Sequence, residues 1–189
     1  MSAMKYCSQC GSAVNHKIPE GDNRHRYVCN QCDTIHYQNP RIIAGCLPVY
    51  QDRVLLCKRA IEPGYGLWTL PAGFMENGET TREGALRETL EEACAHVELK
   101  TLYTLTSITP INQVQMFYLA ELTQPDFAAG DETLETQLFL EHEVPWDQIA
   151  FRTVVNALKL YFEDRKLGQF PLRHFDIHGD KARFQAEKD

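Results

Sequence analysis

The segment from Gly73 to Ala95, GFMENGETTREGALRETLEEACA, restricts the fold of this chain more than any other. Its second half has the composition of a helix, and the whole segment carries six glutamates against two arginines. Like charges three or four residues apart destabilise a helix by about 0.2–0.5 kcal/mol per pair. Some other interaction must therefore compensate for the repulsion among these carboxylates.

A helical projection places the last three glutamates of the segment side by side. At about 100° per residue, Glu88, Glu91 and Glu92 share an arc of about 100°. The opposite side of the projection carries apolar residues, which we expect to face the core: Leu86, Leu90 and Ala93. Thr80 and Glu83 have the spacing of a capping box, which predicts where the helix begins.

Two interpretations of this acidic face are open. A solvent-exposed charged face is common in glutamate-rich helices. Such a face, however, usually alternates its acids with lysines, and this helix has no basic residue after Arg87. Carboxylate oxygens are the ligands that hard divalent cations such as Mg²⁺ prefer. The pattern favours a metal-binding face, on which bound cations would remove the repulsion.

Four of the seven cysteines form two Cys-x-x-Cys pairs, which are 18 residues apart: Cys7, Cys10, Cys29 and Cys32. This spacing is typical of a zinc site in which four thiolates surround the ion as a tetrahedron. Two disulfides would instead require an oxidising compartment, and a redox-active pair would normally follow a strand of a larger α/β unit. We therefore predict a structural Zn²⁺. We expect the other cysteines to be buried thiols and the nearby histidines to be surface residues: Cys46, Cys57 and Cys94, and His16, His25 and His36.

Length and charge limit the class of protein. With 189 residues, 43% of them hydrophobic, the chain can bury one substantial core and a small additional module. The formal net charge of −7 argues against a general nucleic-acid-binding protein. No apolar run reaches the roughly 20 residues of a membrane span, and the N-terminus has no signal-peptide pattern. We expect a cytoplasmic protein with no membrane or nucleic-acid partner.

The chain divides into a zinc ribbon (1–38), a main domain (39–166) and a C-terminal tail (167–189), to which we assign no structure. Residues 42–50 and 53–60 form a predicted β-hairpin. Further strands are predicted at residues 98–108, 113–122 and 133–140, and a second helix at 151–165. The main domain is therefore expected to be α+β.

The acidic segment matches a long gapped pattern, G-x5-E-x7-R-E-U-x-E-E-x-G-U, in which U is apolar, at Gly73, Glu79, Arg87, Glu88, Glu91 and Glu92. This pattern is the Nudix box. Together with the cysteine module and the stretches IHYQNPR, GLWTLPAGFMENGE and TLETQLFLEHEVPW, it resembles the zinc-ribbon Nudix hydrolases, in particular the plant plastid FAD/ADP-ribose pyrophosphatase. Thr89 departs from the pattern because an aliphatic residue is usual there, and Cys94 because the family has glycine. Cys94 must therefore avoid a positive φ or adopt one at a cost.

The resemblance implies an α/β/α sandwich with a mixed sheet, in which the box forms a loop, a helix and a second loop. It implies hydrolysis of a diphosphate that joins a nucleoside to another moiety, with Mg²⁺ or Mn²⁺ neutralising phosphate oxygens and activating water. By position in the box, the metal ligands would be Glu88, Glu91, Glu92 and the backbone carbonyl of Ala72. Arg87 and Glu79 would form an ion pair that orients these carboxylates.

The general base and the substrate contacts lie outside the box. Glu132 and Glu135 are candidates for the base, and each could equally be a solvated loop residue. Tyr65, Trp68 and Phe74 flank the box and could stack on adenine or flavin. Aromatic residues this close to a sheet are, however, more often part of the core.

By resemblance, the expected substrate is a small dinucleotide-type molecule, FAD or ADP-ribose. NADH is the alternative, although the SQPWPFPxS string of NADH pyrophosphatases is absent. A catalytically silent nucleotide-sensing module is a further alternative. The presence of all the box acids argues against it, because degenerate box acids would be expected in such a module. The resemblance also implies a homodimer. The ribbon would serve stability or dimer formation, because four cysteines leave no open coordination position on zinc.

Overall fold

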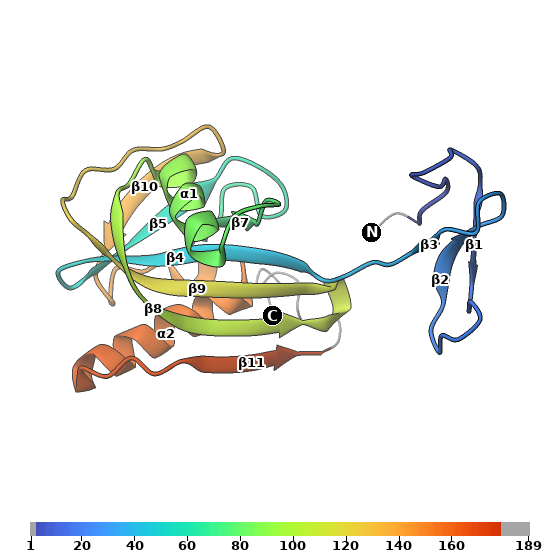
Figure 1. Cartoon of the computed structure of the whole chain (residues 1–189). Coiled ribbons are helices and arrows are strands. Elements are labelled where there is room, and N and C mark those ends of the chain that lie inside the picture. Colours follow the sequence, from blue (N-terminus) through green and yellow to red (C-terminus); the bar gives the residue numbers. More distant parts are fainter. Residues whose placement is uncertain (1–2, 179–189) are drawn as a thin grey trace. The chain divides into compact units, whose positions relative to one another are not determined.

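The computed structural model describes residues 3–178 (Figure 1). These residues belong to two compact units, which divide between Pro40 and Arg41. Within the described part of the chain, no helix is long and apolar enough to cross a membrane.

The N-terminal unit is an antiparallel sheet of three short strands, β1 (Val14–Lys17), β2 (Arg26–Cys29) and β3 (Ile35–His36), in that order. Each Cys-x-x-Cys pair is followed by a residue with a positive φ, namely Gly11 at 74° and Asp33 at 54°. The left-handed conformation reverses the chain directly after the second cysteine of each pair. The two cysteine turns therefore have closely similar backbones.

The C-terminal unit is built on a mixed sheet. Its strands within the described residues are β4 (Arg41–Tyr50), β5 (Arg53–Arg59), β6 (Trp68–Thr69), β7 (Ala72–Phe74), β8 (Val97–Ile108), β9 (Gln113–Leu122), β10 (Thr133–Phe139) and β11 (Arg173–Ile177). Their order is β10-β5-β4-β9-β8-β11, with β6 paired to β5 and β7 paired to β4. The β4–β9 and β8–β11 pairs are parallel, whereas β4 and β5 form the predicted antiparallel hairpin.

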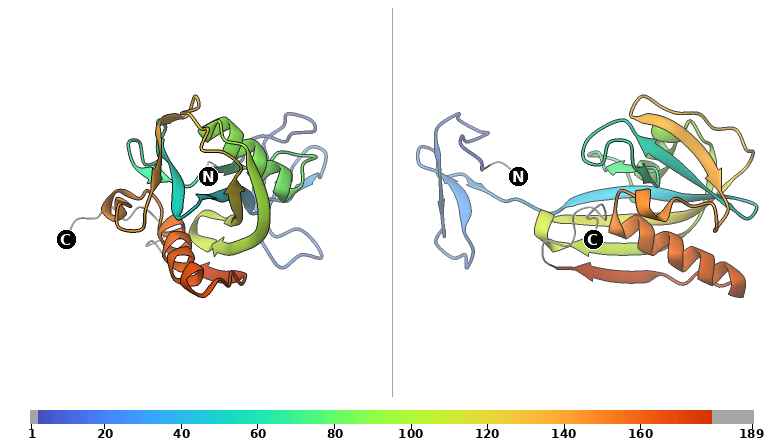
Figure 2. Two further views of the ribbon diagram at one scale, coloured as in Figure 1. Left: turned by 90° about the vertical axis from the view of Figure 1, so that its left-hand side faces the viewer. Right: turned by 180° about the vertical axis from the view of Figure 1, so that it is seen from behind.

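The helices α1 (Thr81–Ala93) and α2 (Arg152–Leu167) cover opposite faces of this sheet (Figures 1 and 2). Neighbouring residues of β4 show the division, since Cys46 packs on the side of α1 and Leu47 belongs to the larger core under α2. Short 3-10 turns lie at η1 (Thr109–Ile111) and η2 (Trp146–Gln148). The predicted α+β class and α/β/α sandwich are confirmed.

The edge strand β11 lies in the tail for which the sequence predicts no structure. It runs parallel to β8, and a buried carboxylate joins it to the rest of the unit. Asp164 of α2 accepts hydrogen bonds from the Tyr103 hydroxyl at 2.8 Å and from Arg173 at 2.7 Å. One side chain thus connects β8, α2 and the segment that begins β11.

Candidate active site

The first turn of α1 begins at the predicted capping box. The Thr80 hydroxyl accepts a hydrogen bond from the Glu83 N–H, and the Glu83 carboxylate accepts one from the Thr80 N–H. The next residue, Thr81, hydrogen-bonds to the hydroxyl of Tyr118 on β9 at 2.7 Å. These contacts set both where the helix begins and where it is attached to the sheet.

The buried face of α1 is not the one that the sequence predicts. Leu86 and Leu90 are 38% and 44% exposed, so the prediction that they face the core is wrong. The residues of α1 that are buried are Gly84, Ala85, Thr89, Glu92 and Ala93. Most of these side chains are small, which lets the helix lie close to β4. The Thr89 hydroxyl donates to the carbonyl of Ala85 at 2.7 Å, so a polar side chain is tolerated at this apolar position.

Glu92 therefore lies between the helix and the sheet. It is 9% exposed, and its Oε2 atom accepts a hydrogen bond from the backbone N–H of Ala72 at 3.1 Å. Burial raises the pKa of Glu92 to about 7, although the Ala72 N–H partly opposes this effect. A carboxylate that has lost its water is stabilised by a cation. The contact places two of the predicted ligand residues next to each other.

Gly73 provides the space for Glu88. A Cβ atom at Gly73 would collide with the carboxyl carbon and both carboxyl oxygens of Glu88. Burial raises the pKa of Glu88, and the neighbouring Arg87 opposes the shift. The first residue of the box is thus glycine because a carboxylate packs directly on its backbone.

Arg87 connects the loop before the helix to the acidic face. It donates to both carboxylate oxygens of Glu79, at 3.0 and 2.8 Å, which forms the predicted ion pair. It also donates to Glu88 at 2.7 Å, to Glu91 at 3.1 Å and to the carbonyl of Phe74 at 3.1 Å. The hydrogen bonds from Arg87 are the largest of the effects that lower the pKa of Glu79 to about 2. Arg87 therefore holds Glu88 and Glu91 of the helix together with Glu79 of the preceding loop.

The three box glutamates of α1 lie on adjacent parts of the helix but do not converge on one point. Glu88 and Glu91 share one nitrogen of Arg87, whereas Glu92 is bonded to the backbone N–H of Ala72 on β7. Among the described residues, the cysteines of the ribbon are the only set of three or more potential ligand atoms within 4.8 Å of one another. The chemistry of the carboxylates nevertheless suits Mg²⁺ or Mn²⁺, which prefer oxygen ligands.

The helix ends in a strained residue. Cys94 has a φ of 48° and a ψ of 29°, the left-handed conformation for which the family uses glycine. Its thiol is exposed, so the prediction that it is buried is wrong, whereas Cys46 and Cys57 are buried as predicted. Cys94 is the residue that caps the end of α1, and its side chain is exposed although its neighbours Ala93 and Ala95 are both buried in the core.

The loop between β9 and β10 brings Glu132 near the acidic face. Two backbone N–H groups of this loop, those of Ala128 and Gly130, donate hydrogen bonds to carbonyls at the end of α1, at 2.9 and 3.1 Å. Burial is the main effect that raises the pKa of Glu88 and Glu92, and the charge of Glu132 raises both further. Glu135 is not part of this cluster. It lies on β10 and pairs with Lys58 at 3.4 Å.

Arg59, at the end of β5, is a residue that the sequence analysis missed. It pairs with Thr133 across the β5–β10 ladder, and its charge counteracts the effect of burial on the pKa of Glu92. Its Nε atom donates to the carbonyl of Pro63 at 2.8 Å, and its guanidinium carbon lies 5.2 Å from the ring of Phe151. A basic residue at the end of an apolar strand is too common a pattern to indicate such a position.

The three aromatic candidates have different environments. Trp68 is 5% exposed and packs edge-on against Phe139 with 5.0 Å between ring centroids, so it is a core residue and is not available to stack on a substrate. Tyr65 is exposed in the loop before β6. Phe74 is exposed too, with the guanidinium carbon of Arg41 4.6 Å from its ring centroid.

The cysteine sulfurs of the ribbon form a compact group. The sulfur atoms of Cys7 and Cys32 are 3.7 Å apart, and those of Cys10 and Cys29 are 3.4 Å apart. With a Zn–S distance of about 2.3 Å, the edge of a tetrahedron is about 3.8 Å. The four side chains therefore fit a structural zinc ion.

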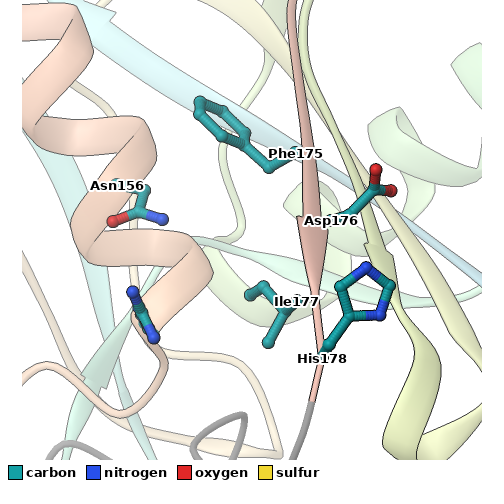
Figure 3. Close-up of a pocket in the computed structure, with 6 residues that line it drawn as sticks. Asn156, Phe175, Asp176, Ile177 and His178 are labelled. Carbon is teal, nitrogen blue, oxygen red and sulfur yellow. The ribbon is translucent and has the colours of Figure 1, made fainter.

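A separate hollow lies between α2 and β11 (Figure 3). The residues that line it are Arg152, Asn156, Phe175, Asp176, Ile177 and His178. None of them is a site residue predicted from the sequence. Since α1 and α2 cover opposite faces of the sheet, the hollow beside α2 is distinct from the acidic face of α1.

Two family models match the chain. A model described as Nudix N-terminal, a zinc ribbon, matches residues 5–38, and a model described as NUDIX domain matches residues 39–161. The second match covers more than half of the chain. Both agree with the two units of the structure.

Similar proteins include a solved structure and named relatives. The crystal structure of a NUDIX hydrolase from Nitrosomonas europaea is 54% identical, with a TM-score of 0.91 over 93% of this chain and 100% of that chain. The NAD-capped RNA hydrolase NudC of Photorhabdus laumondii is 30% identical over 122 residues, which are 62% of this chain and 44% of that protein. The ADP-ribose pyrophosphatase of Methanocaldococcus jannaschii is 28% identical over 113 residues, 58% of this chain and 67% of that protein. The chain thus spans less than half the length of the NudC relative. Because both models match and every charged position of the box is filled, we conclude that the chain belongs to the Nudix hydrolases, with a zinc ribbon ahead of the NUDIX domain.

Proposed function

We propose that this Nudix hydrolase is a Mg²⁺- or Mn²⁺-dependent pyrophosphatase that cleaves the diphosphate of a small dinucleotide-type substrate and releases AMP. The observation that carries the proposal is the position of Glu88 and Glu92. Both carboxylates are withdrawn from water against the backbone of Ala72 and Gly73, which a solvated acidic face would not require. Carboxylates in this position gain stability from divalent cations.

Each residue of the site has a part in the proposal. Bound divalent ions would neutralise the diphosphate oxygens and activate a water molecule. The proposed ligands are Ala72, through its carbonyl, and Glu88, Glu91 and Glu92. Arg87, itself held by two hydrogen bonds to Glu79, keeps the carboxylates of Glu88 and Glu91 on one side of the helix.

For the general base we favour Glu132 over Glu135. Glu132 is close enough to affect the pKa of two box glutamates, whereas Glu135 is engaged by Lys58. Arg59 offers a guanidinium beside the same cluster, where it would bind a phosphate oxygen. Of the three aromatic candidates, Tyr65 and Phe74 are exposed and could stack on a base or flavin.

FAD and ADP-ribose are the proposed substrates. ADP-ribose is supported by the relative from Methanocaldococcus jannaschii, which is named for that activity, and FAD by the resemblance of the ribbon and box segments. A nicotinamide dinucleotide such as NADH is the second candidate. It is favoured by several relatives that are named NAD-capped RNA hydrolases.

The test is a parallel assay of the purified protein with FAD, ADP-ribose, NADH and a deoxynucleoside triphosphate in the presence of Mg²⁺. Products are separated by chromatography. Glu92→Gln serves as the inactive variant and Glu163→Gln as the matched control, because Glu163 is an exposed residue of α2 on the other face of the sheet. Zinc content is measured for each protein, so that loss of the ribbon is not mistaken for loss of the site.

We expect AMP with FMN, or AMP with ribose phosphate, from the wild type and from Glu163→Gln, and neither from Glu92→Gln. AMP with reduced nicotinamide mononucleotide, formed from NADH alone, would instead support the second candidate substrate. No turnover of any of the four compounds, with nucleotide binding retained, would contradict the proposal and favour a nucleotide-sensing module.

A further inference from the structure

We propose that His36 donates a hydrogen bond to the Cys7 thiolate and thereby slows the loss of zinc from the ribbon. The Nε2 atom of His36 lies 3.3 Å from the sulfur of Cys7. Cys7 is 3% exposed and His36 is half-buried, so water has little access to this contact. The prediction that His36 is only a surface residue is therefore wrong.

The direction of the hydrogen bond follows from the chemistry of the sulfur. A thiolate that binds a metal ion has no hydrogen to donate, so the ring nitrogen that faces it carries the hydrogen. The position of His36 is set by strand pairing, since His36 lies opposite Tyr27 in the β2–β3 ladder. The sheet thus positions the backbone of His36 beside the cysteine turn.

The hydrogen bond from His36 is expected to reduce the reactivity of the Cys7 sulfur. Attack by an electrophile on a zinc-bound thiolate requires its electron pair, and a hydrogen bond withdraws density from that pair. Cys7 also accepts the N–H of Gln9 at 3.4 Å, whereas the matching Cys29 accepts two backbone N–H groups, from Gln31 at 3.3 Å and from Cys32 at 3.4 Å. The imidazole of His36 therefore supplies at Cys7 a second donor, where Cys29 has a backbone N–H.

The ribbon supplies matched controls. His16 and His25 pack against each other in a tilted arrangement with ring centroids 5.1 Å apart, and the ring centroids of His16 and Tyr27 are 4.8 Å apart. Within residues 3–178, neither ring has a hydrogen bond to a cysteine sulfur. Replacing one of them removes a ring from the same small sheet without removing a donor to the metal site.

The experiment uses the full chain loaded with Zn²⁺, and it measures the rate at which an excess of a colorimetric chelator captures the ion. The variants are His36→Ala, His36→Phe and His36→Gln, with His16→Ala and His25→Ala as controls. Phenylalanine keeps a ring without a donor, whereas the glutamine amide restores a donor near the position of Nε2.

We expect His36→Ala and His36→Phe to release zinc about tenfold faster than the wild type, since outer partners of metal ligands typically change metal affinity by 10–100-fold. His36→Gln and the two control variants should stay within about threefold of the wild type. Co²⁺-loaded samples should keep the absorption bands of a tetrahedral four-sulfur site, which shows that the ribbon is folded in each variant.

Three results would overturn the proposal: unchanged release from His36→Ala, equally fast release from the control variants, or no rescue by glutamine. If His36→Ala and His36→Phe fail to load zinc while His36→Gln loads it, the donor role is supported. Failure of all three to load zinc would contradict it, because the ring itself would then be what the fold requires. The readout does not depend on which substrate the enzyme hydrolyses.

Discussion

Replacing Glu92 by glutamine tests whether the acidic site is kept at the expense of stability. Glu92→Gln retains the size of the side chain and an oxygen that can accept the Ala72 N–H, but it removes the buried charge. Glu91→Gln is the matched control, since Glu91 belongs to the same box but its side chain is 59% exposed. Both variants should lose metal-dependent hydrolysis, whereas only the first should change the stability of the metal-free site.

The size of the effect follows from the pKa of Glu92, which burial raises from 4.5 to about 7. One pKa unit corresponds to about 1.4 kcal/mol, so ionised Glu92 destabilises the fold by about 3 kcal/mol. Below pH 4.5 the carboxyl group is protonated in the folded and unfolded chains, and it adds no penalty. Between pH 4.5 and about 7 the folded chain binds more protons at this site than the unfolded chain, so the stability of the fold decreases as the pH rises. Above this range Glu92 is ionised in both states, and the penalty is constant.

The measurement is urea denaturation followed by tryptophan fluorescence, in Mg²⁺-free buffer without a strong chelator so that the ribbon keeps its zinc. The free energy of unfolding of Glu92→Gln should exceed that of the wild type by about 3 kcal/mol at roughly pH 8, and the difference should vanish near pH 4.5. Added Mg²⁺ should stabilise the wild type selectively, because the ion binds the folded site. Equal stability changes in Glu91→Gln and Glu92→Gln, or a difference that does not vary with pH, would refute the reasoning.

Three further predictions concern single residues. Gly73→Ala would push the Glu88 carboxylate out of position, so kcat should fall about a hundredfold with little change in melting temperature, and a normal kcat would contradict the packing argument. Cys94→Gly should stabilise the protein by about 1 kcal/mol in chemical denaturation because it relieves the positive φ, whereas Cys94→Ala, which keeps the strain, should not. Asp164→Ala should cost about 3 kcal/mol because the Tyr103 hydroxyl loses its buried acceptor. Hydrogen exchange should then show β11 losing protection before the other strands, and uniform loss would count against the role of Asp164.

Part of the site could be predicted from residue spacing alone. The box residues lie on β7, in the loop after it and on α1, which follow one another directly in the chain, so their separation in sequence largely sets their separation in space. The Thr80–Glu83 capping box and the Arg87–Glu79 ion pair are contacts of this local kind. The two cysteine pairs are also local turns, and zinc chemistry supplies the relation between them.

The orientation of α1 could not be predicted in the same way. The periodicity of the sequence divides the helix into an apolar and an acidic side. It carries no information on the shape of the sheet surface on which the helix packs, so it cannot predict which side is buried. The small side chains of Ala85 and Ala93 allow closer approach to the sheet than Leu86 and Leu90 would, and Glu92 is buried as a consequence. Trp68 is in the core because its short strand pairs with β5, a contact that no local pattern indicates.

The amino-acid sequence by itself determined the zinc-binding cysteines, the position and start of the acidic helix, and the family of the chain, because each depends on residues that are near one another in the chain. The tertiary structure decided which carboxylates are buried, that Glu132 and not Glu135 lies by them, that His36 contacts Cys7, and that β11 completes the sheet. These features depend on contacts between segments far apart in sequence. Such contacts are selected by the packing of the whole domain, in which side-chain size and the pairing of strands override local preference.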